Sequence, residues 1–139
     1  MSQSVDVDFA VLAQLADPTL ASLMPGGVYF DIVPASAGSK FVLVELYDHE
    51  DQYQFQGRAF ERFVYDITAV EKASAIGDGE DARQRIEAVL QDVALTITGY
   101  DHSKTRRVRY LRFMRPDEND RANRWQHRGG RYEVIVSPV

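Results

Sequence analysis

The segment from residue 58 to residue 71 constrains the fold more than any other part of the chain, because it reads as one long β-strand. It is rich in the aromatic and β-branched side chains that pack well on a pleated surface. These residues are Phe60, Phe63, Val64, Tyr65, Ile67 and Val70. Strands in globular proteins are usually about 5–6 residues long. We therefore expect part of this strand to project beyond the hydrophobic core.

Shorter apolar runs predict the partner strands of a sheet. They cover residues 28–30, 41–47, 95–100, 106–115 and 132–136. The run 41–47 is apolar at nearly every position, which predicts a strand buried on both faces. Residues 48–51 read as an acidic turn. Residues 116–130 are polar and predict an exposed loop, although Gly129-Gly130 is also typical of a two-residue hairpin turn.

Two amphipathic stripes predict the main helices. The first begins near Asp6 or Asp8, and the second covers residues 82–93. Between them, Asp17-Pro18 combines a good helix cap with a favoured first helical residue, and it predicts a short helix over residues 19–23.

The order of helix, strands, helix and strands predicts an α+β fold. We expect a mostly antiparallel sheet with the two main helices packed on one face. A chain of 139 residues is one domain's worth, so a single domain over residues 1–139 is predicted, with an exposed polar loop near residues 116–130.

The chain contains no cysteine. This excludes disulfides, thiol nucleophiles and cysteine-ligated metal sites. No segment has the roughly 18–20 apolar residues of a membrane span, and the first residues lack the basic and apolar regions of a signal peptide. We therefore expect a protein made and kept in a reducing compartment, with no membrane partner.

The net charge of -5 hides a strong asymmetry along the chain. Residues 1–103 contain 6 basic and 17 acidic residues, which gives -11. Residues 104–139 contain 10 basic and 4 acidic residues, which gives +6. Such a split indicates a charged partner: nucleic acid, an acidic protein surface, or another copy of the same chain.

The pattern Gly77-x-Gly79 before a helix is the feature most similar to a catalytic or phosphate-binding motif. It lacks the third glycine and the lysine of such motifs. Asp78, Glu80 and Asp81 also place negative charge where a phosphate would bind. The preferred interpretation is a turn followed by an acidic helix start.

The three histidines follow none of the spacings typical of metal or nucleophile–base sites. His49 lies among acidic residues that could bind a cation weakly, but a solvated acidic turn is the preferred interpretation. No set of nucleophile, base and orienting residue can be named. We therefore predict no enzyme, no cofactor, no metal and no catalytic residue.

The basic strand at residues 106–115 is the more informative feature, because arginines alternate with apolar and aromatic residues along it. This mixture is typical of protein interfaces. A nucleic-acid surface and a solvated basic edge that discourages aggregation are the alternatives. The hypothesis is a head-to-tail interface in which arginines of one copy meet acidic residues of the next. Its candidate residues are Arg106, Arg107, Arg109 and Arg112 on the basic side, and Asp48, Glu50, Asp51, Glu80 and Asp81 on the acidic side.

Several phrases of the chain resemble the tail terminator, or tail completion, proteins of long-tailed bacteriophages. The opening resembles them through Leu15-Ala16-Asp17-Pro18-Thr19-Leu20-Ala21-Ser22-Leu23 and then Gly26-Gly27-Val28-Tyr29-Phe30. Residues 65–70 match their long central strand, 82–90 their crossover helix and 130–136 their closing strand. The family usually has arginine where this chain has Val28, and loop 116–128 is more basic than is usual there.

The resemblance implies a structural component of a phage virion or tail-like particle, made in the bacterial host cytoplasm. Such a protein forms a hexameric ring at the head-proximal end of the tail tube. It would end polymerisation of the tail tube protein and offer a surface to the head–tail connector protein. DNA would be only passing cargo in the ring lumen. A connector or stopper protein of the neck, and a nucleic-acid-binding module using the basic C-terminal quarter, are the alternatives.

Overall fold

The chain forms a five-stranded sheet with the strand order β1-β2-β3-β5-β4. The computed structural model describes residues 2–54, 57–120 and 122–138. The strands are β1 (Val28–Phe30), β2 (Lys40–Gln54), β3 (Gly57–Lys72), β4 (Tyr100–Pro116) and β5 (Arg124–Pro138). β1 runs parallel to β2, and the other neighbouring pairs are antiparallel. The prediction of a mostly antiparallel sheet is confirmed.

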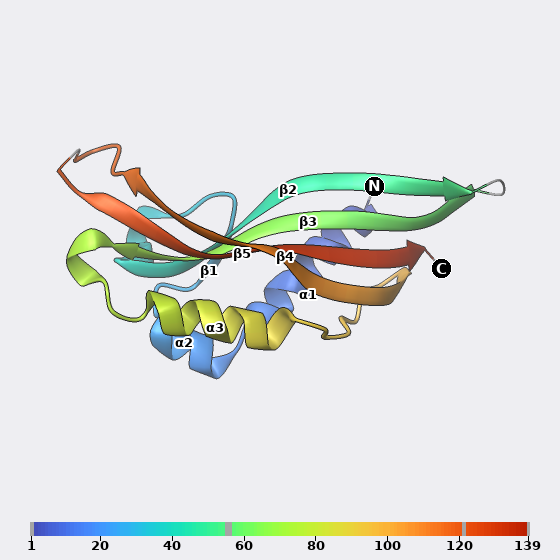
Figure 1. The fold of residues 1–139 in the computed structure, drawn as a ribbon, viewed down its shortest axis with the longest axis horizontal. Helices are drawn as coiled ribbons and strands as arrows, with labels where there is room; N and C mark the ends of the chain where they lie inside the picture. The colour runs from blue at the N-terminus through green and yellow to red at the C-terminus, as the bar shows by residue number, and fades with distance from the viewer. Residues whose placement is uncertain (1, 55–56, 121, 139) are drawn as a thin grey trace.

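The helices lie on one face of this sheet, as predicted (Figure 1). They are α1 (Ser2–Leu15), α2 (Pro18–Leu23) and α3 (Gly79–Leu90), and two short 3-10 turns, η1 (Ala35–Ala37) and η2 (Ala73–Ala75), complete the described elements. We call this side of the sheet the helix face and the other side the open face. Among the described residues, no helix combines the length and apolar character needed to cross a bilayer.

The main core lies between the helix face and the helices. Alternate residues of a strand point to opposite faces, so Val42 and Val44 of β2 enter this core while Phe41 and Leu43 lie on the open face. Tyr65 of β3 and Tyr132 of β5 are the largest fully buried side chains of the core. Burial raises the pKa of Tyr65 far above its usual range, and its hydroxyl donates a hydrogen bond to Asp8 of α1 at 2.6 Å.

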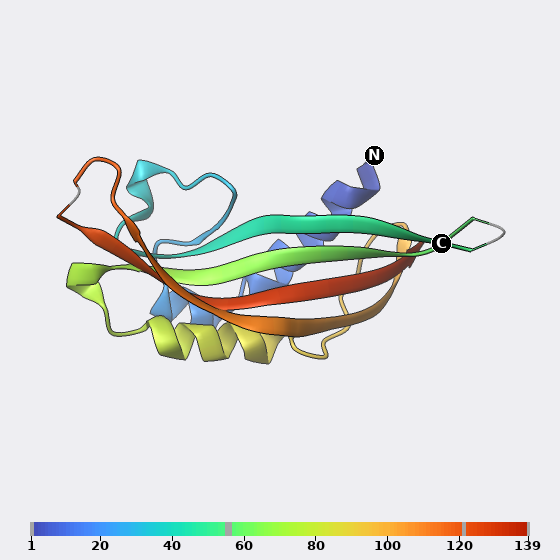
Figure 2. The same cartoon turned by 45° about the horizontal axis from the view of Figure 1, so that its top comes forward.

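The β2–β3 hairpin extends well past the helices, so the prediction of a projecting strand is confirmed (Figures 1 and 2). The pairing runs from Lys40↔Glu71 to Gln54↔Gly57. The predicted acidic turn at residues 48–51 is wrong, because these residues continue β2. Their backbone pairs with β3 after a bulge between Leu46 and Asp48. A long partner strand thus keeps a polar, charged segment extended.

The predicted Gly129-Gly130 hairpin turn is also wrong, because both glycines lie inside β5 between β3 and β4. A Cβ atom at Gly129 would overlap the carbonyl oxygen of Ile67 on β3. The glycine therefore permits a close approach of two strands instead of a turn. The expected loop over residues 116–130 shortens to the segment between β4 and β5, where Asp117 N–H donates to the carbonyl of Asn123 at 3.0 Å.

The predicted strand over residues 95–100 is wrong as well, because this stretch has no regular secondary structure before Tyr100 begins β4. Leu95 and Ile97 are nevertheless buried in the core. Their alternating apolar pattern therefore reflects burial in the core and not regular strand structure.

The predicted cap of the short helix α2 is confirmed. Asp17 is the N-cap, its carboxylate accepts from Leu20 N–H at 2.9 Å, and Pro18 opens the helix. Arg85 of α3 donates two side-chain hydrogen bonds to the same carboxylate at 2.7 and 2.8 Å. The Arg85 guanidinium and the Leu20 amide lower the pKa of Asp17 to about 2.

The Gly77-x-Gly79 segment is filled by a carboxylate of the protein itself. Glu71, at the end of β3 and 1% exposed, accepts from the backbone N–H groups of Gly77, Asp78 and Gly79 at 2.8–3.1 Å. Lys40 lies 3.4 Å from the same carboxylate. Glu71 therefore occupies the anion position at the start of α3 that a phosphate would need. A Cβ atom at Gly79 would overlap Glu71, whereas one at Gly77 meets open space.

These two glycines give a matched pair of variants. We expect Gly79→Ala to lower the free energy of unfolding by about 1–3 kcal/mol, because the added methyl group displaces a buried, fully bonded carboxylate. Gly77→Ala should instead stabilise the fold by up to about 1 kcal/mol, since it only restricts the unfolded chain. Denaturant unfolding of both variants measures the difference. Equal effects of the two substitutions would contradict the proposed role of Glu71.

Candidate subunit interface

The sheet has two edges that are open over part of their length. β1 pairs only with Val42, Leu43 and Val44 of β2, so the rest of β2 has no strand beside it among the described residues. At the opposite edge, β4 pairs with β5 on its inner side. Its outer side is covered near Thr105, whose carbonyl accepts from Asp92 N–H at 2.9 Å, and near Arg107. Among the described residues, no strand lies beside residues 46–54 of β2 or on the outer side of residues 108–116 of β4, so these stretches are open strand edges.

Two of the four predicted interface arginines are already engaged within the chain. Arg106 forms an ion pair with the buried Glu133, and Arg107 forms one with Glu87 of α3. Arg109 and Arg112 are exposed, and neither makes an ion pair within the part of the chain that the structure describes. Of the predicted basic set, these two remain available to a partner.

The predicted acidic residues fall into two groups that the fold does not bring together. Asp48, Glu50 and Asp51 lie on β2 where its edge is open, whereas Glu80 and Asp81 lie in the first turn of α3. Glu50 is 3.3 Å from Arg62, and Glu80 is 2.6 Å from Arg83 and 3.5 Å from Arg128. Asp48 and Asp81 are exposed. The β2 group is the one that lies at a sheet edge.

A network of charges crosses the open face of the sheet. Glu133 of β5 accepts from Arg62 of β3 at 2.6 Å and from Arg106 of β4. Burial of Glu133 acts to raise its pKa, but the two guanidinium groups outweigh burial and lower it. Alongside, Arg131 binds Asp66 at 2.7 Å and lies 3.5 Å from the centre of the Tyr47 ring. These contacts hold β2, β3, β5 and β4 together across the open face.

Several of the large exposed apolar side chains of the described residues lie at the same two edges. Val108, Tyr110 and Met114 belong to β4, and Leu46 and Tyr47 belong to β2. Val5 and Phe9 lie on α1, and Ile32 follows β1, the strand that pairs with β2. The other members of the set are Phe60 and Ile76. Sequence analysis identified the charges and the apolar residues that alternate with them on β4, but not the apolar residues of β2 and α1, because their exposure depends on which strands lie at the edges.

One cluster near the β2 edge has the chemistry of a cation site. Single ligand atoms of His49, Asp51 and Glu61 lie within 4.8 Å of one another. His49 Nε2 is 2.8 Å from Glu61, and the ring of His49 stacks on Phe63 at 4.1 Å. The Tyr100 hydroxyl donates to Glu61 at 2.9 Å. These contacts brace β2, β3 and β4 without any ion, so we assign the cluster no ligand.

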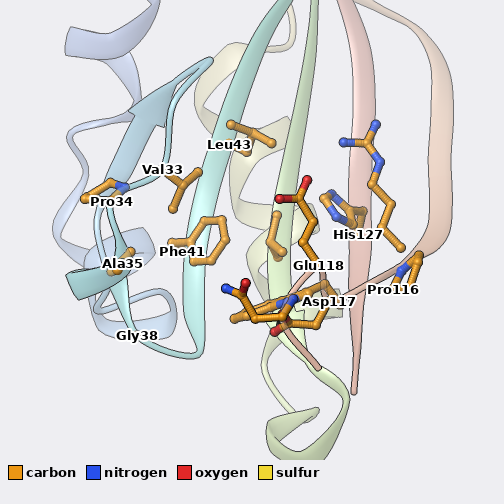
Figure 3. Close-up of a pocket in the computed structure, with 15 residues that line it drawn as sticks. Val33, Pro34, Ala35, Gly38, Phe41, Leu43, Pro116, Asp117, Glu118 and His127 are labelled. Atoms are coloured by element: carbon orange, nitrogen blue, oxygen red, sulfur yellow. Dashed lines mark hydrogen bonds between the residues drawn. The ribbon is translucent and has the colours of Figure 1, made fainter. Parts of the chain in front are cut away.

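A groove of about 370 Å³ lies on the open face near the β4–β5 loop (Figure 3). Phe41, Trp125 and His127 contribute to its walls. His127 is 4% exposed, stacks on Phe113 at 4.5 Å and lies 3.3 Å from the Thr68 hydroxyl. Burial, with a smaller effect of Arg115, lowers the pKa of His127 to about 4. His127 is therefore a neutral packing residue at pH 7.

Comparison with known proteins finds the same fold in solved structures but no match by sequence. No protein-family model matches the sequence, and no curated protein matches it. A solved structure described as the virion of a native gene transfer agent particle superposes with a TM-score of 0.66 at 21% identity, over 91% of each chain. A second solved chain superposes with a TM-score of 0.53 at 16% identity, over 94% of each chain. The chain therefore shares the fold of a chain in that gene transfer agent virion.

The burial of His127 predicts a pH dependence of stability. The folded pKa of His127, about 4, lies below the unfolded value of 6.5. The stabilising contribution of the buried neutral ring to the free energy of unfolding is therefore complete above pH 6.5 and is lost as the pH falls toward 4. The unfolding free energy of the wild type should fall by about 2–3 kcal/mol relative to His127→Gln between pH 7.5 and 4. Denaturant unfolding across this range measures the difference, and parallel curves would contradict it.

Proposed function

We propose that this protein is a structural component of a phage or phage-like virion that acts as a tail terminator. It forms a ring, expected to be a hexamer, on the head-proximal end of the tail tube. There it ends polymerisation of the tube protein and provides the joining surface for the head-side connector. DNA passes through its lumen as cargo. The role requires no catalysis, cofactor or metal.

The observation that carries this proposal is the arrangement of charge at the two sheet edges. The exposed Arg109 and Arg112 lie on the β4 edge, while Asp48 and Glu50 lie on the open part of β2. Each edge also presents exposed apolar side chains. Surfaces that complement each other on opposite sides of one subunit produce head-to-tail contacts, which close into a ring when the rotation between neighbours permits. Charge complementarity sets the register of such contacts and speeds association.

The likeness to a chain of a gene transfer agent virion supports a role in a particle of this kind. A connector or stopper protein of the neck would use the same ring-forming surfaces and remains the alternative within this class. Position in the particle separates the two, because a terminator caps the isolated tail tube and a stopper binds only on the head side.

The structure supports the nucleic-acid-binding alternative less well than the ring-forming role. Arg106, Arg107, Arg128 and Arg131 are in ion pairs within the chain, so much of the basic C-terminal quarter is already neutralised. Steep salt dependence of affinity, which marks phosphate binding, requires free cations.

Charge reversal tests the proposal. We expect Arg109→Glu/Arg112→Glu to abolish ring formation, because the reversed edge repels the acidic edge of the neighbour. Arg124→Glu, an exposed arginine at the start of β5, is the control and should assemble normally. Size-exclusion chromatography at low salt and electron microscopy with tail tubes measure assembly. If the double variant still forms normal caps on tail tubes, the proposal is contradicted.

A further inference from the structure

We infer that neighbouring subunits join by backbone pairing of their sheet edges, with residues 108–116 of β4 in one copy beside residues 46–54 of β2 in the next. The inference rests on the proposed ring, and it names the surface through which copies of this chain meet. One continuous sheet would then run around the assembly.

The chain itself defines where each edge is open. On β2, β1 covers the edge as far as Val44, whose carbonyl accepts from Asp31 N–H at 2.9 Å. On β4, the segment after α3 covers the edge at Thr105 and Arg107, through Asp92 and Gln91. Each edge is therefore blocked at one end, and at the other end no strand of the described residues lies beside it, although His49 N–H on β2 donates to its neighbour Asp48 at 2.9 Å. Such edges are templates for strand addition.

The strand directions fit this pairing. β2 and β5 run one way and β3 and β4 run the other, because each neighbouring pair in β2-β3-β5-β4 is antiparallel. A head-to-tail repeat keeps these directions the same in every subunit. β4 of one copy then meets β2 of the next in the antiparallel sense, in which inter-strand hydrogen bonds are perpendicular to the strands.

The charges fit on both faces of the joined sheet. Arg109 pairs across the ladder with Arg131, which puts its side chain on the open face, and Asp48 and Glu50 of β2 share that face. Arg112 pairs with Arg128, whose side chain reaches Glu80 of α3 on the helix face. His49 of β2 lies on the helix face, because its ring stacks on the core residue Phe63. Asp51 is two residues further along the strand and therefore lies on the same face. Each free arginine thus faces acidic residues on its own side.

The two open edges lie at opposite ends of the molecule. Leu46, Tyr65, Tyr132 and Arg107 form one row across the sheet through consecutive pairings. From this row, the open part of β2 runs toward the β2–β3 tip, and the open part of β4 runs toward the β4–β5 loop (Figures 1 and 2). Neighbouring copies must therefore be offset along their strands. A closed assembly accommodates such an offset when its strands tilt relative to the ring axis, as in β-barrels.

The absence of cysteine makes a cross-linking test clean, because every thiol is introduced. One copy carries Arg109→Cys or Leu111→Cys on the open face of β4, and the other carries Asp48→Cys or Glu50→Cys on the open face of β2. A short thiol-specific cross-linker should join at least one of these four mixtures into covalent dimers. A single chain with both substitutions of the productive pair should form a ladder that ends at the ring size.

The matched control replaces the β4 cysteine with Glu118→Cys, an exposed position in the β4–β5 loop, and it should give no cross-link to β2. If rings cap tail tubes but none of the four mixtures cross-links, the ring stands and the edge pairing is overturned. If the edges cross-link but no cap forms on tubes, the pairing stands and the terminator role fails. Cross-linking of the control as strongly as the test pairs would also overturn the inference.

Discussion

The pairing of β2 with β3 is the constraint on which the other features of the molecule depend. It extends far beyond the helices and carries two register shifts, between Leu46 and Asp48 and between Gln52 and Tyr53. Because side chains alternate between faces, a slip of one residue would move every core residue to the open face. The same register places Asp48, Glu50 and Asp51 on an edge that β1 is too short to cover. The core and the acidic edge are therefore consequences of one ladder of hydrogen bonds.

The fold class and the main elements could be predicted from the sequence because they depend on local patterns. The stripe of the second main helix, the Asp17-Pro18 cap and the aromatic strand at residues 58–71 are local signals, and each was confirmed. The predicted start of the first helix near Asp6 or Asp8 is wrong, because α1 already begins at Ser2 and Asp8 accepts a hydrogen bond from Tyr65. The wrong predictions share a different cause. Gly129-Gly130 looks like a turn until a neighbouring strand approaches it closely, and residues 48–51 look like a turn until β3 pairs with them.

The candidate interface could be predicted only in part, for the same reason. A single sequence shows which residues are charged but not which charges the fold pairs internally. Arg106 and Arg107 seemed equivalent to Arg109 and Arg112, yet Glu133 and Glu87, distant in sequence, pair with the first two. The hypothesis of charge complementarity stays a prediction, now centred on fewer residues. The apolar residues that alternate with these arginines were recognised in the sequence, whereas the exposed Leu46 and Tyr47 of β2 could be placed at an edge only when the strand order was known.

The buried carboxylate of Glu71 has a consequence for how the molecule moves. It joins the end of β3 to the first turn of α3 and to Lys40 at the start of β2. Separating α3 from the sheet would break the three backbone N–H bonds of this buried carboxylate and leave it with Lys40, which is costly. The helix and this end of the sheet therefore open together or not at all, as one cooperative unit. The ion pair of Arg107 with Glu87 attaches β4 to the same helix, so this cooperative unit includes the edge at which we propose that a neighbour docks.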